Sequence, residues 1–164
     1  MWRISQLQHR ASAAARAGVI DQDARVRASA SIDVDAEPEE VWRVLADIEG
    51  WPGFVPGVTR VVLERPGAVG VGTQFRWRNA CTPIRSTVEV AEPGRELTWT
   101  GTALWLVAVH RNEVTALGPG GSRLTSSESM AGVGVGIILP ARALERQLGK
   151  FVAAIAGQAM RHPT

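Results

Sequence analysis

Tyrosine is absent from the chain, and cysteine and histidine are scarce. Cys81 is the single cysteine, which excludes an internal disulfide and any zinc site built from several cysteines. The three histidines stand at positions 9, 110 and 162, two of them near the ends, so we expect no metal site and no bound cofactor. The lack of tyrosine removes one common catalytic acid. The lack of disulfides is typical of a reducing compartment and predicts a cytoplasmic location.

An excess of charge of one sign is also missing, because 18 basic residues stand against 16 acidic ones. Every basic residue except Lys150 is an arginine, which never loses its proton, and this accounts for the high pI. We therefore expect no nucleic-acid partner. No apolar run reaches the ~18 residues of a membrane span. The glycines at 132, 134 and 136 do not have the spacing of a dinucleotide-binding loop.

The first 24 residues differ in composition from the rest of the chain. Arginines at 3, 10 and 16 precede any acidic residue, with alanine and serine between them, and few side chains form a convincing apolar face. The composition permits a targeting peptide. We favour instead an N-terminal extension over residues 1–24, mobile or folded as a short helix and dispensable for folding. Residues 25–164 are then expected to form one domain.

The end of the chain predicts a long helix over residues 139–161. Pro140 suits a first helical position, because its missing N–H is not needed there. Apolar residues recur at the three- and four-residue spacing of one broad helical face. They are Leu144, Leu148, Phe151, Val152, Ile155, Ala159 and Met160. Such a helix requires a large apolar surface to pack against.

The rest of the domain reads mainly as strands. Residues 28–34 alternate between apolar and polar, Asp35 is a candidate cap for a helix that begins near Pro38, and a second short helical turn follows in residues 50–57. Six more candidate strands are separated by glycine- and proline-containing turns, at 58–64, 73–79, 84–91, 96–100, 105–117 and 122–130. The order predicts an α+β fold in which a seven-stranded antiparallel sheet curls around the C-terminal helix, with two short helices after the first strand.

Several strings in this order resemble the START-like (SRPBCC) superfamily, whose members have a helix-grip fold. They are AEPEEVW at 36–42, DIEGWP at 47–52, FRWRN at 75–79, LTWTG at 97–101, His110, and TSSESMAG at 125–132. Together they span about residues 26–160 and resemble most the polyketide cyclase/dehydrase-like branch. The resemblance implies that residues 25–164 form a START-like ligand-binding domain, with an apolar cavity between sheet and helix. The superfamily contains enzymes and plain carriers, so a reaction is not implied.

Strand alternation indicates which side chains face this cavity. We expect a ligand to meet apolar side chains at one end of the sheet and polar side chains at the other. Two aromatic residues are expected at the mouth of the cavity, and two further residues are contributed by the helix. The predicted set is Trp51, Phe54, Phe75, Trp77, Asn79, Ser86, Val88, Trp99, His110, Asn112, Glu128, Leu148 and Phe151. The alternative is that the tryptophans are ordinary core residues and that the polar groups satisfy one another or lie at a wet rim.

The turn at residues 118–121 makes the last two strands a hairpin, and this fixes a pairing. Val114 and Leu124 are both apolar and both expected to point inward. If they are opposite one another, His110 lies opposite Glu128, close enough for an interaction. His110 and Glu128 are therefore our candidate catalytic residues, if the protein is an enzyme.

Three functions fit these features. The first is a carrier or sensor of a small hydrophobic or amphipathic ligand, such as a lipid, an isoprenoid or a polyketide-like aromatic. The second is an enzyme similar to polyketide aromatase/cyclases, which would use His110 and Glu128 for proton transfer. The third is a quinone-binding or partner-binding module, because residues 47–56 also resemble the opening of coenzyme Q-binding START-like proteins. A protein partner or a homodimer is possible in the third case.

Overall fold

The computed structural model describes residues 2–161. Its seven strands form one sheet in the order β1-β7-β6-β5-β4-β3-β2, and all neighbouring strands are antiparallel. The strands are β1 (Val26–Val34), β2 (Val58–Leu63), β3 (Gln74–Asn79), β4 (Thr82–Glu92), β5 (Glu96–Ala103), β6 (Leu106–Gly118) and β7 (Gly121–Ala131). The predicted α+β fold is thereby confirmed.

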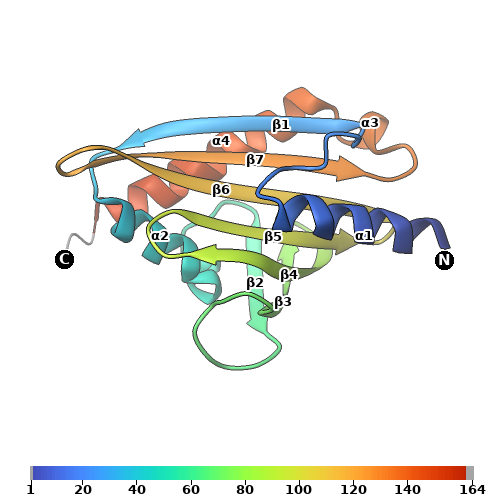
Figure 1. Ribbon diagram of the computed structural model, residues 1–164, viewed down its shortest axis with the longest axis horizontal. Helices are drawn as coiled ribbons and strands as arrows, with labels where there is room; N and C mark the ends of the chain where they lie inside the picture. The colour runs from blue at the N-terminus through green and yellow to red at the C-terminus, as the bar shows by residue number, and fades with distance from the viewer. Residues whose placement is uncertain (1, 162–164) are drawn as a thin grey trace.

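The long helix α4 (Ala141–Ala159) and the N-terminal helix α1 (Trp2–Arg16) lie on opposite faces of the sheet (Figure 1). Shorter helices are α2 (Pro38–Ala46), the 3-10 helix η1 (Ile48–Gly53) and α3 (Val135–Ile138). The two short helices predicted after the first strand are therefore present. The predicted C-terminal helix begins two residues later than expected, because Pro140 is its extended N-cap and not its first turn.

The connection after β1 contains α2 and η1, and it places Trp51 of η1 inside the fold. Pro38 begins α2, and Glu39 and Glu40 lie at the positive end of its dipole. The predicted capping role of Asp35 is wrong, because the N-cap is Glu37 and no side chain caps the helix. Asp47 caps the next helix, η1, by accepting the Gly50 N–H at 3.2 Å.

The main core lies between the inner face of the sheet and helices α2 and α4. Helix α4 buries the apolar stripe that the sequence predicts, with the exception of Met160, which caps the helix and is 47% exposed. Its buried residues are Leu144, Leu148, Phe151, Val152, Ile155, Ala156 and Ala159. The sheet meets this stripe with large side chains such as Trp99, Phe75 and Leu97, so the helix is gripped as expected.

Helix α1 lies on the outer face of the sheet and packs against it. Ala11 and Ala15 are buried against Val107 and Val109 of β6. Sequence reasoning missed this face because alanine is a weak apolar signal, yet its small size lets the helix approach the strand closely.

Polar groups also fix α1 on the sheet. Glu89 of β4 is almost completely buried under the helix. Its carboxylate accepts a hydrogen bond from the Ser12 hydroxyl and an ion-paired one from Arg16 Nε, both at 2.8 Å, and a longer one from Thr100 Oγ1 at 3.3 Å. The acceptor atoms of Glu89 would lose these partners if α1 left the sheet, and this would oppose undocking.

Ala15→Leu should lower the free energy of unfolding by about 1–3 kcal/mol, because the added atoms have no space between α1 and β6. The matched control is Ala13→Leu, two residues earlier on the exposed side of the same helix, which should change stability by no more than about 0.5 kcal/mol. Urea unfolding measures both. Equal, near-zero effects of the two substitutions would show that α1 is not docked in solution, and that residues 1–24 are the dispensable extension first expected.

Candidate functional site

A cavity of about 510 Å³ lies between the inner face of the sheet and α4. Aromatic side chains form much of its wall, and its remaining lining is mostly apolar. Nine of the predicted site residues line it: Trp51, Trp77, Asn79, Ser86, Trp99, His110, Glu128, Leu148 and Phe151. A cavity of this size and character is typical of a small-molecule binding site.

Four predicted site residues do not line the cavity. Phe75 and Val88 point inward but are fully buried in the core, and Phe54 packs half-buried against the same core. The rings of Trp51 and Trp99 lie against Phe75, at centroid distances of 6.1 and 6.2 Å, and fill the space in front of it. Alternation predicts the face of a side chain correctly, but it cannot tell whether a neighbouring ring fills the space before it.

Trp51 is the centre of the aromatic wall. Its ring contacts Trp77, Trp99 and Phe151 at centroid distances of 6.2, 5.3 and 5.8 Å, mostly edge to face. It is fully buried. Among the side chains that the structure describes, those of residues 4–161, its indole Nε1 is the one buried donor without a hydrogen-bond acceptor. An unsatisfied donor of this kind costs stability, so the wall of the cavity is not built for stability alone.

The fourth residue outside the lining, Asn112, is fully buried and begins a chain of hydrogen bonds. Its Nδ2 donates to the Leu97 carbonyl at 3.1 Å, which turns Oδ1 toward Ser126. The Ser126 hydroxyl donates to this oxygen at 2.8 Å, so its own oxygen is left to accept from His110 Nε2 at 2.7 Å. His110 therefore carries its proton on Nε2 and presents an unprotonated Nδ1 toward Glu128.

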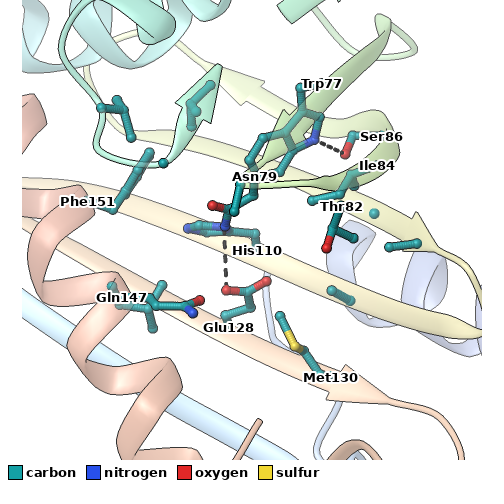
Figure 2. Close-up of a pocket in the computed structure, with 18 of the residues that line it drawn as sticks. Trp77, Asn79, Thr82, Ile84, Ser86, His110, Glu128, Met130, Gln147 and Phe151 are labelled. Atoms are coloured by element: carbon teal, nitrogen blue, oxygen red, sulfur yellow. Dashed lines mark hydrogen bonds and ion pairs between the residues drawn. The ribbon is translucent and has the colours of Figure 1, made fainter. Parts of the chain in front are cut away.

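His110 and Glu128 face one another across β6 and β7, as the hairpin prediction requires. Val114 pairs with Leu124, and the same register places His110 opposite Glu128. His110 Nδ1 and Glu128 Oε2 are 3.8 Å apart, and both side chains line the cavity (Figure 2). This distance is longer than a direct hydrogen bond, so both groups keep hydrogen-bonding capacity for a third molecule.

Burial makes both members of the pair uncharged. Removal from water lowers the pKa of His110 to about 3 and raises the pKa of Glu128 to about 8. At neutral pH the imidazole is neutral and the carboxyl group keeps its proton. The cavity thus presents one acceptor, His110 Nδ1, beside one group that can donate, the Glu128 carboxylic acid.

Other lining residues were missed by sequence reasoning. Met130 lies two residues after Glu128 on the same face of β7, so alternation could have found it. Gln147 and Lys150 belong to the polar side of α4, which periodicity assigns to solvent, yet they line the cavity as well. Figure 2 shows the Gln147 side chain directed from α4 toward Glu128. Helical periodicity separates apolar from polar residues, but it does not distinguish polar residues that face solvent from polar residues at the rim of a cavity.

The polar edge near β3 is held by its own contacts. Trp77 Nε1 donates to Ser86 Oγ at 3.0 Å, and both residues line the cavity (Figure 2). Asn79 lines it too, beside Gly57, where a Cβ atom would lie 2.8 Å from the amide oxygen of Asn79. Throughout the described part of the chain, no group of three or more metal-ligating side chains occurs.

The profile of the family described as "Polyketide cyclase / dehydrase and lipid transport" matches residues 25–161. The chain belongs to this family. Membership agrees with the resemblance drawn from the sequence strings and supports a hydrophobic ligand-binding or cyclase role. Among curated protein sequences, none is significantly similar to this chain. No helix within residues 2–161 is long and apolar enough to span a membrane.

Solved structures show that this family member shares its fold with START-like proteins. A START superfamily protein from Mycobacterium smegmatis is 14% identical, covers 82% of this chain and 97% of its own, and has a TM-score of 0.70. The ZhuI aromatase/cyclase from Streptomyces sp. R1128 is 20% identical, with coverages of 82% and 93% and a TM-score of 0.68. The norcoclaurine synthase from Thalictrum flavum is 15% identical, with coverages of 84% and 88% and a TM-score of 0.67. At these identities the likeness shows the fold alone.

Proposed function

We propose that this family member binds a small, uncharged, largely hydrophobic molecule that carries at least one oxygen, as a carrier or sensor. The observation that supports this most is the His110–Glu128 pair, which lies inside an aromatic-walled cavity and is uncharged at neutral pH. A hydroxyl or carbonyl group placed between the two side chains would receive a hydrogen bond from the Glu128 acid, and a hydroxyl would also donate to His110 Nδ1.

The remaining wall of the cavity favours flat ligands. Four aromatic rings, those of Trp51, Trp77, Trp99 and Phe151, can stack on a planar molecule. The unsatisfied Nε1–H of Trp51 also favours a ligand with a hydrogen-bond acceptor. Aromatic polyketides, isoprenoid quinones and sterol-like lipids share these features. An anionic ligand fits the inner end poorly, because its charge would be buried beside an uncharged pair.

Native mass spectrometry of the freshly purified protein tests this proposal. A retained small molecule should be seen, and the same class of compound should raise the melting temperature when added from a library of lipids, quinones and aromatic polyketides. An empty cavity together with no thermal shift across this library would contradict the proposal.

Ala108→Phe should weaken binding of such a ligand by at least about tenfold, because Ala108 lines the cavity on the same strand face as His110. Thr115→Phe is the matched control, since Thr115 lies on the same strand and is exposed. Isothermal titration calorimetry with the compound found above measures both variants. Equal affinities in the two variants would place the ligand outside this cavity.

The same pair also supports a second candidate, a cyclase-type enzyme. His110 Nδ1 would remove a proton from a carbon between two carbonyl groups, this carbon would attack the carbon atom of a further carbonyl group, and Glu128 would give its proton to the oxygen of that group. Transfer of the proton from His110 to Glu128 would then restore both uncharged side chains. One carbon–carbon bond forms, and the attacked carbonyl becomes a hydroxyl group. Incubation with a poly-β-keto thioester, followed by mass spectrometry, distinguishes a cyclase from a ligand carrier. Accelerated cyclisation that is lost in His110→Ala supports the enzyme, and recovery of unchanged compound supports the carrier.

A further inference from the structure

Exposed apolar side chains gather at one end of the molecule. Of the ten large hydrophobic residues that are exposed among those described, five lie on two neighbouring connections, the β5–β6 turn and the segment from β7 to α4. These five form what we call the apolar tip: Leu104, Trp105, Val133, Ile137 and Ile138. The tip lies where β5 leads into β6 and where β7 leads into α3, at the right-hand end of Figure 1.

The two connections of the apolar tip are joined to each other. Trp105 Nε1 donates a hydrogen bond to the Val133 carbonyl at 3.0 Å. Gly132 has a φ of 151° and packs so closely that a Cβ atom there would lie 2.9 Å from the Trp105 carbonyl oxygen. These contacts make one continuous surface of the two segments, whereas exposed apolar residues elsewhere on a protein are usually scattered.

Folding alone does not explain the residues of the tip. Leu104 has a φ of 54°, in the left-handed region that favours glycine and asparagine, and it is 68% exposed. Ile137, at 89%, is also almost fully exposed. A bulky apolar side chain in a disfavoured backbone conformation, pointing into water, costs free energy and gains no packing. Such a residue indicates that another molecule covers this surface when the protein carries out its function.

The tip adjoins the lining of the cavity. Ile138 belongs to both, and Leu139, Ala103 and Leu106 continue the tip into the cavity wall. A hydrophobic molecule that enters or leaves the cavity at this end would pass the tip.

The charges around the tip are mainly basic. The segments that flank it, residues 22–27 and 140–150, contain five basic and two acidic residues. The Arg25 side chain lies beside Gly136 of α3, and Arg142 is exposed in the first turn of α4. An apolar surface with a basic surround is complementary to a bilayer with anionic headgroups. A second copy of the chain would bring the same arginines face to face, so self-association is disfavoured.

We propose that the apolar tip inserts into the surface of an anionic lipid bilayer and thereby places the adjoining end of the cavity at the membrane. The apolar residues would enter the boundary between headgroups and acyl chains, and the arginines would contact lipid phosphates. This binding concerns the protein surface, and it would take place whichever ligand the cavity holds.

Flotation with vesicles of phosphatidylcholine and phosphatidylglycerol tests the proposal with the full chain. The unaltered protein should float with these mixed vesicles and bind pure phosphatidylcholine vesicles at least about tenfold more weakly. The double variant Leu104→Asn/Ile137→Gln should bind the mixed vesicles at least about tenfold more weakly than the unaltered protein. Asparagine suits the left-handed conformation at position 104, so the variant should remain folded.

The matched control is Leu117→Asn/Val71→Gln, which replaces two exposed apolar residues outside the tip, one at the end of β6 and one in the connection between β2 and β3. It should float as the unaltered protein does. Three results would overturn the proposal: no flotation of the unaltered protein, equal flotation of the two double variants, or a dimer in light scattering that only the tip variant dissociates. The last result would assign the tip to self-association.

Discussion

Replacing Phe151 with alanine should lower the free energy of unfolding by about 3–5 kcal/mol. The side chain is 9% exposed and lies where α4 meets the sheet, with ring centroid distances of 5.8 Å to Trp51, 6.4 Å to Trp99 and 5.2 Å to His110. Its loss would remove three aromatic contacts and join the new space to the existing cavity, which the rigid sheet cannot close.

Urea unfolding at pH 6 measures this effect. Arg146→Ala is the control, since Arg146 lies on the exposed side of the same helix, and it should change stability by no more than about 0.5 kcal/mol. A loss of less than about 1 kcal/mol for Phe151→Ala would mean that the sheet does not grip α4 at this position. A hydrophobic ligand that fills the enlarged space should restore part of the lost stability, because it binds the folded state.

The fold could be predicted from the sequence because local periodicity and chain order agree with each other. The alternating strands, the glycine- and proline-containing turns and the long amphipathic helix admit one simple arrangement, a curled sheet around the helix. The same periodicity places His110 opposite Glu128, because one apolar pair, Val114 and Leu124, is enough to fix the register of a hairpin.

The parts that could not be predicted depend on packing between distant segments. The docking of α1 rests on two alanines, whose burial becomes visible only when β6 lies beneath them. Three-dimensional packing also decides whether an inward-pointing side chain meets empty space or another ring. For this reason Trp77 lines the cavity, whereas Phe75 on the same strand face does not. The apolar tip also brings together two segments that are about 30 residues apart in the chain.

The pH dependence of stability should reveal the buried pair. The pKa of His110 is lowered from 6.5 to about 3, so its neutral burial stabilises the protein above pH 6.5, and this contribution is lost as the pH falls toward 3. The pKa of Glu128 is raised from 4.5 to about 8, so its contribution is complete below pH 4.5 and is lost as the pH rises toward 8. Between pH 4.5 and 6.5 the two slopes are opposite and cancel.

Above pH 6.5 only the slope of Glu128 remains, because His110 is then neutral in both the folded and the unfolded chain. Over this range the unfolded chain has released the Glu128 proton that the folded chain still holds. The free energy of unfolding should therefore fall by about 1.4 kcal/mol per pH unit, or by about 2 kcal/mol in total, between pH 6.5 and 8.

Glu128→Gln should abolish this alkaline decline, because glutamine keeps the size and hydrogen-bonding groups of the side chain but cannot ionise. Relative to the unaltered protein, the variant should gain about 5 kcal/mol of stability between pH 4.5 and 8, the full range over which Glu128 resists ionisation. Urea unfolding curves across this range measure the difference, with Glu92→Gln on the exposed end of β4 as a control that should retain the decline. An unchanged decline in Glu128→Gln would mean that Glu128 ionises freely in the folded protein, and the cavity would then present a carboxylate rather than an uncharged acid to its ligand.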